Sequence, residues 1–194
     1  MSVNLSKGQQ ISLAKSSGGA LTSVRMGLGW QAAVRKGLLA RLTGPRAIDL
    51  DASALLFSGQ QLVDVVFFQQ LVSKDGSVRH TGDNLTGSAG AGADDESILV
   101  DLEQVPANVD QIVFTVNSFT GQTFTEVQDA FCRLVDETTG KELARYTLSG
   151  GGAHTAQIMA KLHRVGGDWQ LKAIGEPASG QTFQHLLPAI GPHL

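Results

Sequence analysis

The sequence lacks the features that mark several classes of protein. Its 194 residues include a single cysteine, Cys132, so no disulfide can form within the chain. The opening residues lack the apolar stretch of a secretory signal, and every apolar run is far shorter than the roughly 18 to 20 residues of a membrane-spanning helix. These absences argue against a disulfide scaffold and predict a soluble protein of the reducing cytoplasm.

Acidic side chains are missing from the first quarter of the chain. Residues 1–48 hold seven basic side chains and no Asp or Glu, whereas residues 49–110 hold eleven acidic side chains against Lys74 and Arg79. The net charge of -3 hides this segregation. The basic stretch Arg35–Arg46 is either a solvated loop or a contact for an anionic partner. Because aromatic residues do not interleave with it, we expect no nucleic-acid partner.

What is present suffices for a folded core. Hydrophobic residues make up 42% of the chain, and no repeat or long linker divides it, so residues 1–194 are interpreted as one domain. Glycine is frequent, at 23 residues, which is typical of many short elements joined by tight turns. Apolar residues recur at every second position through most of the chain, which predicts half-buried strands. The predicted strands are 24–30, 48–56, 62–68, 97–102, 111–117, 130–135, 143–148, 157–163 and 169–173.

The predicted turns and helices complete a mainly β fold. Gly166-Gly167 separates the last two strands and predicts a hairpin, and the apolar run Leu62–Phe68 predicts a central strand. Only Gln31–Leu42 and Thr182–Ile190 have spacing that fits short helices, the second with an early stop at Pro188. The fold class is therefore an antiparallel two-sheet β-sandwich, or a barrel, with one or two short helices.

Acidic side chains in the middle of the chain are candidate ligands for a metal ion. Asp49 and Asp51 lie two apart on a predicted strand, so both carboxylates point the same way. Further acidic and amide groups lie in a glycine-rich loop. Oxygen ligands on a strand and a wrapping loop suit a hard cation such as Ca²⁺, although the same residues also make ordinary turns and solvated faces. The loop candidates are Asp83, Asn84, Asp94, Asp95 and Glu96.

No motif predicts an enzyme. The segment Gly27–Ala32 fits a dinucleotide-binding pattern and Asp49 follows about twenty residues on, but the alternation that continues through Trp30 places these glycines inside a sheet. Cys132 lies in an apolar strand pattern, which favours a buried, inert thiol over a nucleophile. We therefore expect no catalytic residues and no organic cofactor.

Several segments together resemble one known family. These are VNLSKGQQISL, VRMGLGW, DLDASALLF, DGSVRHTGDNLTG with DDE after it, and VDQIVFTV. In this order they are similar to the tellurium-resistance TerD family, also described as a stress-response and calcium-binding domain family. The resemblance covers essentially the whole chain. It implies a β-sandwich that binds Ca²⁺ through acidic loops, without catalytic activity, and that works with other proteins of a stress-response assembly near the inner membrane surface.

The family motifs place the ligands and also reveal departures. The resemblance implies that Asp49 and Asp51 stand in the family's DLD, Asp83 and Asn84 in its GDN, and Asp94, Asp95 and Glu96 in its DDE. Compared with the family pattern, two departures lower the local negative charge: Gln31 stands where an acid is usual, and Ser88–Ala93 carries no charge where the family is acidic. A third departure, Gln69-Gln70 in place of Asn-Asn, exchanges one pair of neutral amides for another.

These departures leave two hypotheses. Ligand charge tunes Ca²⁺ affinity over several decades, so we expect either a weakened Ca²⁺ site or a lost one. The first hypothesis is a non-enzymatic stress-response protein that binds Ca²⁺ weakly. The second is an interaction module that kept the fold and lost the metal, with the basic Arg35–Arg46 loop supplying positive charge at the acidic edge.

Overall fold

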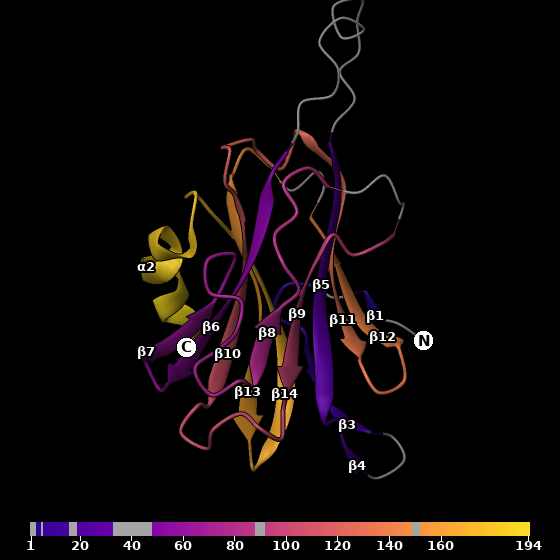
Figure 1. Cartoon of the computed structure of the whole chain (residues 1–194), viewed down its shortest axis with the longest axis vertical. Coiled ribbons are helices and arrows are strands. Elements are labelled where there is room, and N and C mark those ends of the chain that lie inside the picture. Colours follow the sequence, from indigo (N-terminus) through magenta and orange to yellow (C-terminus); the bar gives the residue numbers. More distant parts are fainter. Residues whose placement is uncertain (1–2, 5, 16–18, 33–47, 88–91, 149–151) are drawn as a thin grey trace, which may run out of the picture.

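Two six-stranded sheets stack face to face in the computed structural model (Figure 1). The structure describes residues 3–4, 6–15, 19–32, 48–87, 92–148 and 152–194. The first sheet has the order β1 (Val3–Asn4), β12 (Lys141–Thr147), β11 (Val127–Asp136), β5 (Ser23–Ala32), β9 (Glu96–Asp101), β8 (Val78–His80). The second has the order β2 (Gln10–Ser12), β14 (Asp168–Ala178), β13 (Ala156–Val165), β10 (Gln111–Ser118), β6 (Leu50–Ser58), β7 (Gln61–Val66). A small pair, β3 (Ala14–Lys15) and β4 (Gly19–Ala20), stands apart.

The sandwich prediction is confirmed, and the sheets do not close into a barrel. Neighbouring strands within both sheets run antiparallel, with one exception: β1 lies parallel to β12. The sequence pattern did not predict β1, β2, β3, β4 or β8. These strands have two or three residues each, too few for a period of two to be recognised.

The core lies between the sheets and follows the alternation of the sequence. Val24, Met26, Leu28 and Trp30 enter it from β5, and every second residue of β6 enters it from the other sheet. The side chains between them must then point away from the core. On β6 these residues begin with Asp51 and Ser53, while Leu55 and Phe57 join a second apolar cluster on the outer face of that sheet.

A C-terminal helical segment covers the second apolar cluster. It comprises η1 (Phe183–Leu186), α2 (Leu187–Ile190) and η2 (Gly191–His193), and Figure 1 shows it against the β6 and β7 side of the sandwich. The helix predicted from Thr182 is thus confirmed. Pro188 does not stop it early, because it occupies the first turn of α2, where its missing N–H costs no helical bond.

The structure corrects the central placement expected for Leu62–Phe68. Strand β7 is the edge strand of the second sheet. Its apolar side chains are covered by the helical segment, since Leu62, Val65 and Phe67 pack against the second cluster. A strand covered by a helix can be as rich in apolar residues as a strand at the centre of a sheet.

Two further predictions have definite outcomes. The hairpin is confirmed, because β13 and β14 pair up to Val165 and Asp168 around Gly166 and Gly167, whose positive φ angles suit a two-residue turn. The helix expected over Gln31–Leu42 is wrong at its start, because Gln31 and Ala32 belong to β5, and residues 33–42 lie outside the described residues. Within the described part of the chain, no helix has the length and apolarity to span a membrane.

Candidate metal site

Three aspartates from two parts of the chain meet beside the start of β6. One carboxylate oxygen from each of Asp49, Asp51 and Asp83 lies within 4.8 Å of the others. Asp49 precedes β6 and Asp51 is its second residue, so the period of two aims both side chains the same way, as the sequence predicted. Asp83 comes from the loop after β8, on the other sheet. Stacking the sheets brings its carboxylate to the pair.

The group is buried enough to make its charges costly. Asp49 and Asp51 are 8% and 6% exposed, whereas Asp83 is exposed. Burial, and then the neighbouring charges of Asp83 and Glu96, raise the pKa of Asp49 to about 6. Burial, and then the charges of Asp49, Glu96 and Asp83, raise the pKa of Asp51 to about 8. At neutral pH, Asp51 therefore tends to hold a proton until a cation takes its place.

Unpartnered oxygens point to what the group lacks. Asp49 Oδ1 and Asp51 Oδ2 are buried without a hydrogen-bond partner among the described residues. A buried carboxylate oxygen without a donor is rare in folded proteins, because its lost hydration must be replaced. A bound cation would satisfy both oxygens, so the aspartates fit a metal ion.

Asn117 is a neighbour of this group that sequence reasoning missed. It lies directly opposite Asp51 in the pairing of β10 with β6, on the outer face of the second sheet. Its Nδ2 donates to the Gly180 carbonyl at 3.0 Å, while its Oδ1 is buried without a partner in the described part of the chain. A neutral amide oxygen beside two aspartates is a suitable additional ligand for a hard cation. The polar end of an otherwise apolar strand was its only signal in the sequence.

Glu96 connects the two sheets underneath the aspartates. Its side chain is fully buried on β9, and Oε2 accepts the backbone N–H of Ala52 on β6 at 2.8 Å. Oε1 accepts the backbone N–H of Asn84 at 3.1 Å. His80 Nε2 lies 3.3 Å from Oε2, and His80 Nδ1 accepts the Gly82 N–H, so the ring proton lies on the nitrogen that faces Glu96. Through these contacts, Glu96 holds the loop at Asn84 against β6.

The acids of the DDE run do not belong to the group of three aspartates. Asp95 Oδ2 accepts the Trp30 backbone N–H at 2.9 Å, and Asp95 Oδ1 accepts Asn84 Nδ2 at 3.2 Å. Asp94 lies elsewhere, in ion pairs with Arg25 and Arg133. The DDE run thus splits into three environments, because successive residues leave a chain in different directions.

The structure also places two of the residues at which the sequence departs from the family pattern. Gln70 Nε2 donates to Asp64 Oδ1 at 2.9 Å, so its side chain is hydrogen-bonded to the edge strand β7 of the second sheet. Gln31 lies on β5 opposite Gln128 of β11. Of the uncharged loop, residues 88–91 lie outside the described residues, as does the basic stretch Arg35–Arg46.

Two predictions about other motifs are confirmed. Cys132 is buried, and desolvation raises the pKa of its thiol to about 12, as expected of an inert side chain. Gly27 and Gly29 lie within a continuous strand that runs through Trp30, so the dinucleotide-like pattern forms no phosphate-binding turn.

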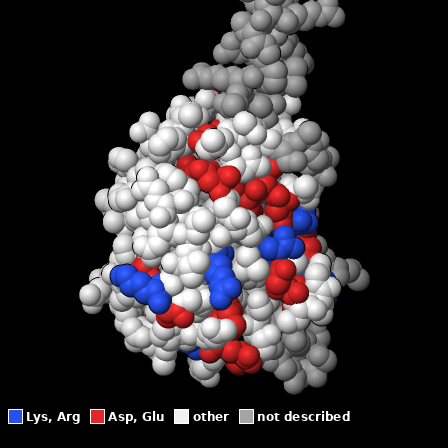
Figure 2. Space-filling view, viewed as in Figure 1, with Lys and Arg blue, Asp and Glu red and all other residues white. Residues whose placement is uncertain are grey.

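The fold and the site define a class: a β-sandwich with a buried carboxylate group at the junction of its sheets, able to hold a metal ion. Figure 2, viewed from the same side as Figure 1, shows acidic side chains gathered in a band across the molecule. Comparison of the sequence with known families then identifies the family. The TerD domain matches residues 1–188, and the chain belongs to the TerD family.

Relatives with established names cover nearly the whole chain. Tellurium resistance protein TerZ of Serratia marcescens is 47% identical over 95% of this chain and 94% of its own. Stress response protein SCP2 of Bacillus subtilis is 38% identical over 96% and 98%. A crystal structure of a TerD homologue from Streptomyces coelicolor has a TM-score of 0.73 at 18% identity, covering 89% of this chain and 98% of that one. This last likeness concerns the fold alone.

Proposed function

We propose that this TerD-family protein is a non-enzymatic stress-response protein that binds Ca²⁺ weakly at Asp49, Asp51 and Asp83. The observation that carries the proposal is the pair of buried, unpartnered oxygens on Asp49 and Asp51. Like charges held within 4.8 Å of one another repel unless a proton or a cation lies between them. A divalent ion neutralises two carboxylates at once, which one proton cannot do.

The ligand chemistry favours Ca²⁺. The group offers only oxygen donors, which suits a hard cation, and it lacks the sulfur and imidazole ligands that Zn²⁺ prefers. Ca²⁺ takes six to eight oxygens in adaptable geometry, whereas Mg²⁺ demands a near-ideal octahedron. Asp49, Asp51 and Asp83 would supply charged oxygens, and Asn117 a neutral one.

Weak affinity follows from competition with protons. An Asp51 with a pKa of about 8 must lose its proton before it can bind a metal at neutral pH. Glu96 is already engaged with the backbone N–H groups of Ala52 and Asn84, so it acts on the cation through its charge. Asp94 forms ion pairs with two arginines, so its charge adds little to cation binding.

The alternative function is an interaction module without metal. The favouring observation is that the pKa of Asp51, raised to about 8, lets a proton neutralise this carboxylate in the folded protein at neutral pH. Under this alternative, the acidic surface would contact a partner directly.

A thermal melt with Ca²⁺ or with EDTA separates the two functions. Ca²⁺ at one hundred times its dissociation constant contributes about 2.7 kcal/mol, a rise of several degrees in Tm for a chain of this size. We expect this rise in the wild type and in the control Asp168→Asn, an exposed residue at the start of β14, and its loss in Asp51→Asn. An identical Tm with Ca²⁺ and EDTA in the wild type would favour the module.

The stress-response part has its own test. Its support is the relatives named for tellurium resistance and stress response. Expression of the wild type in a tellurite-sensitive strain should restore growth on tellurite, and Asp51→Asn should not. Equal growth with both proteins would separate resistance from metal binding.

A further inference from the structure

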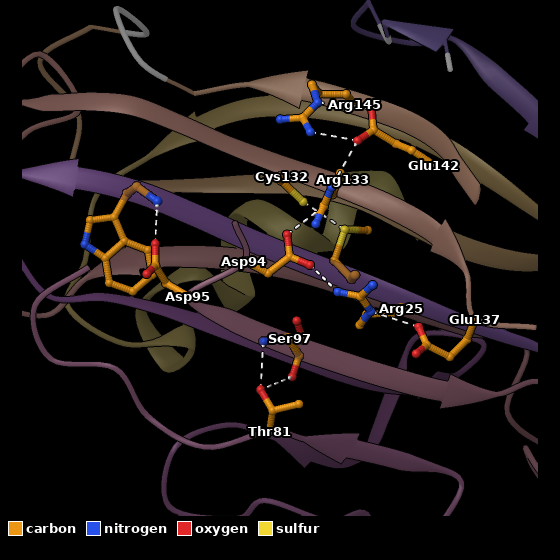
Figure 3. A network of polar contacts seen from close by, with 12 residues as sticks. Arg25, Thr81, Asp94, Asp95, Ser97, Cys132, Arg133, Glu137, Glu142 and Arg145 are labelled. Carbon is orange, nitrogen blue, oxygen red and sulfur yellow. Dashed lines mark hydrogen bonds and ion pairs between the residues drawn. The ribbon is translucent and has the colours of Figure 1, made fainter. Parts of the chain in front are cut away.

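Asp94 is held by two arginines on the outer face of the first sheet (Figure 3). Its side chain is 6% exposed. One carboxylate oxygen accepts Arg133 Nε at 2.7 Å, and the other accepts a terminal nitrogen of Arg25. Arg25 comes from β5 and Arg133 from β11, so one carboxylate joins two neighbouring strands. This arrangement is distinct from the aspartate group beside β6.

Two glycines of β5 make room for the segment that carries Asp94. A Cβ at Gly27 would overlap the Asp94 carboxylate, and a Cβ at Gly29 would overlap the Ala93 carbonyl and lie 2.6 Å from the Phe131 ring. The segment at Ala93 and Asp94 therefore crosses β5 in direct contact with its backbone. Gly27 and Gly29 are the glycines of the MGLGW motif, and close approach of another chain segment is their physical role.

Further side chains brace the two arginines. Arg25 Nε donates to Glu137 at 2.8 Å, and Arg133 lies 3.4 Å from Glu142, which also accepts Arg145 at 2.7 Å. The guanidinium of Arg145 stacks over Phe131, 4.0 Å from the ring centroid. Figure 3 shows this network extending from Arg25 on β5 to Arg145 on β12. The Asp94 hydrogen bond in turn raises the pKa of Arg133, which favours the charged guanidinium.

The residues that follow Asp94 lead directly to the metal site. The Asp95 backbone N–H donates to the Leu28 carbonyl at 2.7 Å, and its carboxylate accepts the Trp30 N–H and the Asn84 amide. Glu96 then enters the interior beneath the aspartates. The contact of Asp94 with β5 thus determines where the following residues, Asp95 and Glu96, lie.

We infer that Asp94, Arg25 and Arg133 form a clamp that positions the Asp95–Glu96 segment for cation binding. Asp94 is a positioning residue and contributes no ligand oxygen, although it stands in the DDE run. The inference rests on the proposed Ca²⁺ function. Asp95 and Glu96 act on the site from outside the three aspartates, since they hold Asn84 and the backbone of β6 beside them. Outer partners of a metal site typically change metal affinity 10- to 100-fold when they are replaced.

The sign of an arginine substitution separates a clamp from simple electrostatics. Arg133 is a positive charge near a cation site, so removing it should raise Ca²⁺ affinity if only charge matters. If Arg133 holds Asp94 in place, removing it should lower the affinity. The two outcomes have opposite directions.

The experiment compares Ca²⁺ titrations of the full chain by calorimetry. We expect Arg133→Gln to weaken Ca²⁺ binding about 10-fold. Asp94→Asn should weaken it by a similar factor, and the double variant by no more than either single one, with stoichiometry unchanged. The control is Arg79→Gln: Arg79 lies on the same face as Arg25, both opposite Leu99, and its Nε points to the Gly76 carbonyl. Unchanged or tighter binding in Arg133→Gln would overturn the clamp.

Amide hydrogen exchange tests the clamp in the absence of metal. In EDTA, amide hydrogen exchange at Asp95, Glu96 and Ser97 should be about 10-fold faster in Arg133→Gln than in Arg79→Gln, because local opening then breaks fewer contacts. Equal exchange in the two variants would refute the clamp, whatever the titrations give. A wild type that binds no Ca²⁺ but retains this difference would refute the proposed function alone.

Discussion

Asp51 and Asn117 lie directly opposite each other on β6 and β10, and each has a buried side-chain oxygen without a partner among the described residues. Directly opposed residues of an antiparallel pair have Cβ atoms about 5 Å apart. Two acceptors at this separation do not satisfy each other. A proton or a cation between them would satisfy both.

The first prediction concerns the pH dependence of stability without metal. The pKa of Asp51 rises from 3.8 to about 8 on folding, so between these values the native state binds more protons than the unfolded state. The contribution of Asp51 to stability must then fall as pH rises from about 4 to about 8. Asp49 adds a contribution of the same sign up to about pH 6. The contribution of Asp51 reaches a few kcal/mol, because each pKa unit corresponds to about 1.4 kcal/mol.

Urea unfolding in EDTA at a series of pH values would measure this slope. Asp51→Asn should flatten most of it, while Asp168→Asn should follow the wild type. Saturating Ca²⁺ should also flatten it, since a cation replaces the proton. A pH dependence from pH 5 to pH 8 in EDTA that is the same in the wild type and in Asp51→Asn would contradict the raised pKa of Asp51.

The second prediction concerns Asn117. If its Oδ1 contributes to the cation site, Asn117→Ala should weaken Ca²⁺ binding about 10-fold or more. Asn117→Asp should lower the stability of the metal-free protein, because it places a third buried carboxylate beside Asp51, and should tighten Ca²⁺ binding. Calorimetry and urea unfolding in EDTA give the two quantities. Equal affinities for the wild type and both variants would exclude Asn117 as a ligand.

The third prediction concerns Glu96 as a connection between the sheets. Replacing it by Ala leaves the backbone N–H groups of Ala52 and Asn84 without their acceptor. Hydrogen bonds to a charged acceptor contribute about 1.5 to 3 kcal/mol each, so we expect a loss of several kcal/mol in EDTA. Glu96→Gln should lose less, because the amide keeps one acceptor oxygen. Glu103→Ala, at an exposed site after β9, is the control and should change stability little.

The fourth prediction concerns the glycines of β5. Gly29→Ala should destabilise the protein by about 1 to 3 kcal/mol, because the new methyl group meets a backbone carbonyl and an aromatic ring. Gly27→Ala should displace Asp94 and speed hydrogen exchange at Asp95. Gly191→Ala is the matched control, since a Cβ there meets nothing within 4 Å and its φ is -45°. Thermal melts would rank the three variants, and equal Tm values would contradict the close crossing of β5.

Much of the fold was predictable because it depends on local alternation. Val24 to Trp30 on β5 and Leu50 to Leu56 on β6 display their buried faces in the sequence. The central position expected for Leu62–Phe68 was wrong, because an apolar run does not reveal whether a strand or a helix covers it. The shortest strands were missed because two or three residues define no period.

The sequence by itself determined the strand faces, the family and the common direction of Asp49 and Asp51, because these depend on neighbouring residues and ordered motifs. Only the tertiary structure decided which acids meet. It brought Asp83 from the other sheet to the pair, added Asn117, and placed Asp94 with Arg25 and Arg133 on the outer face of the first sheet. Contacts between segments far apart in the chain depend on how the sheets stack. Neither spacing nor composition records that stacking.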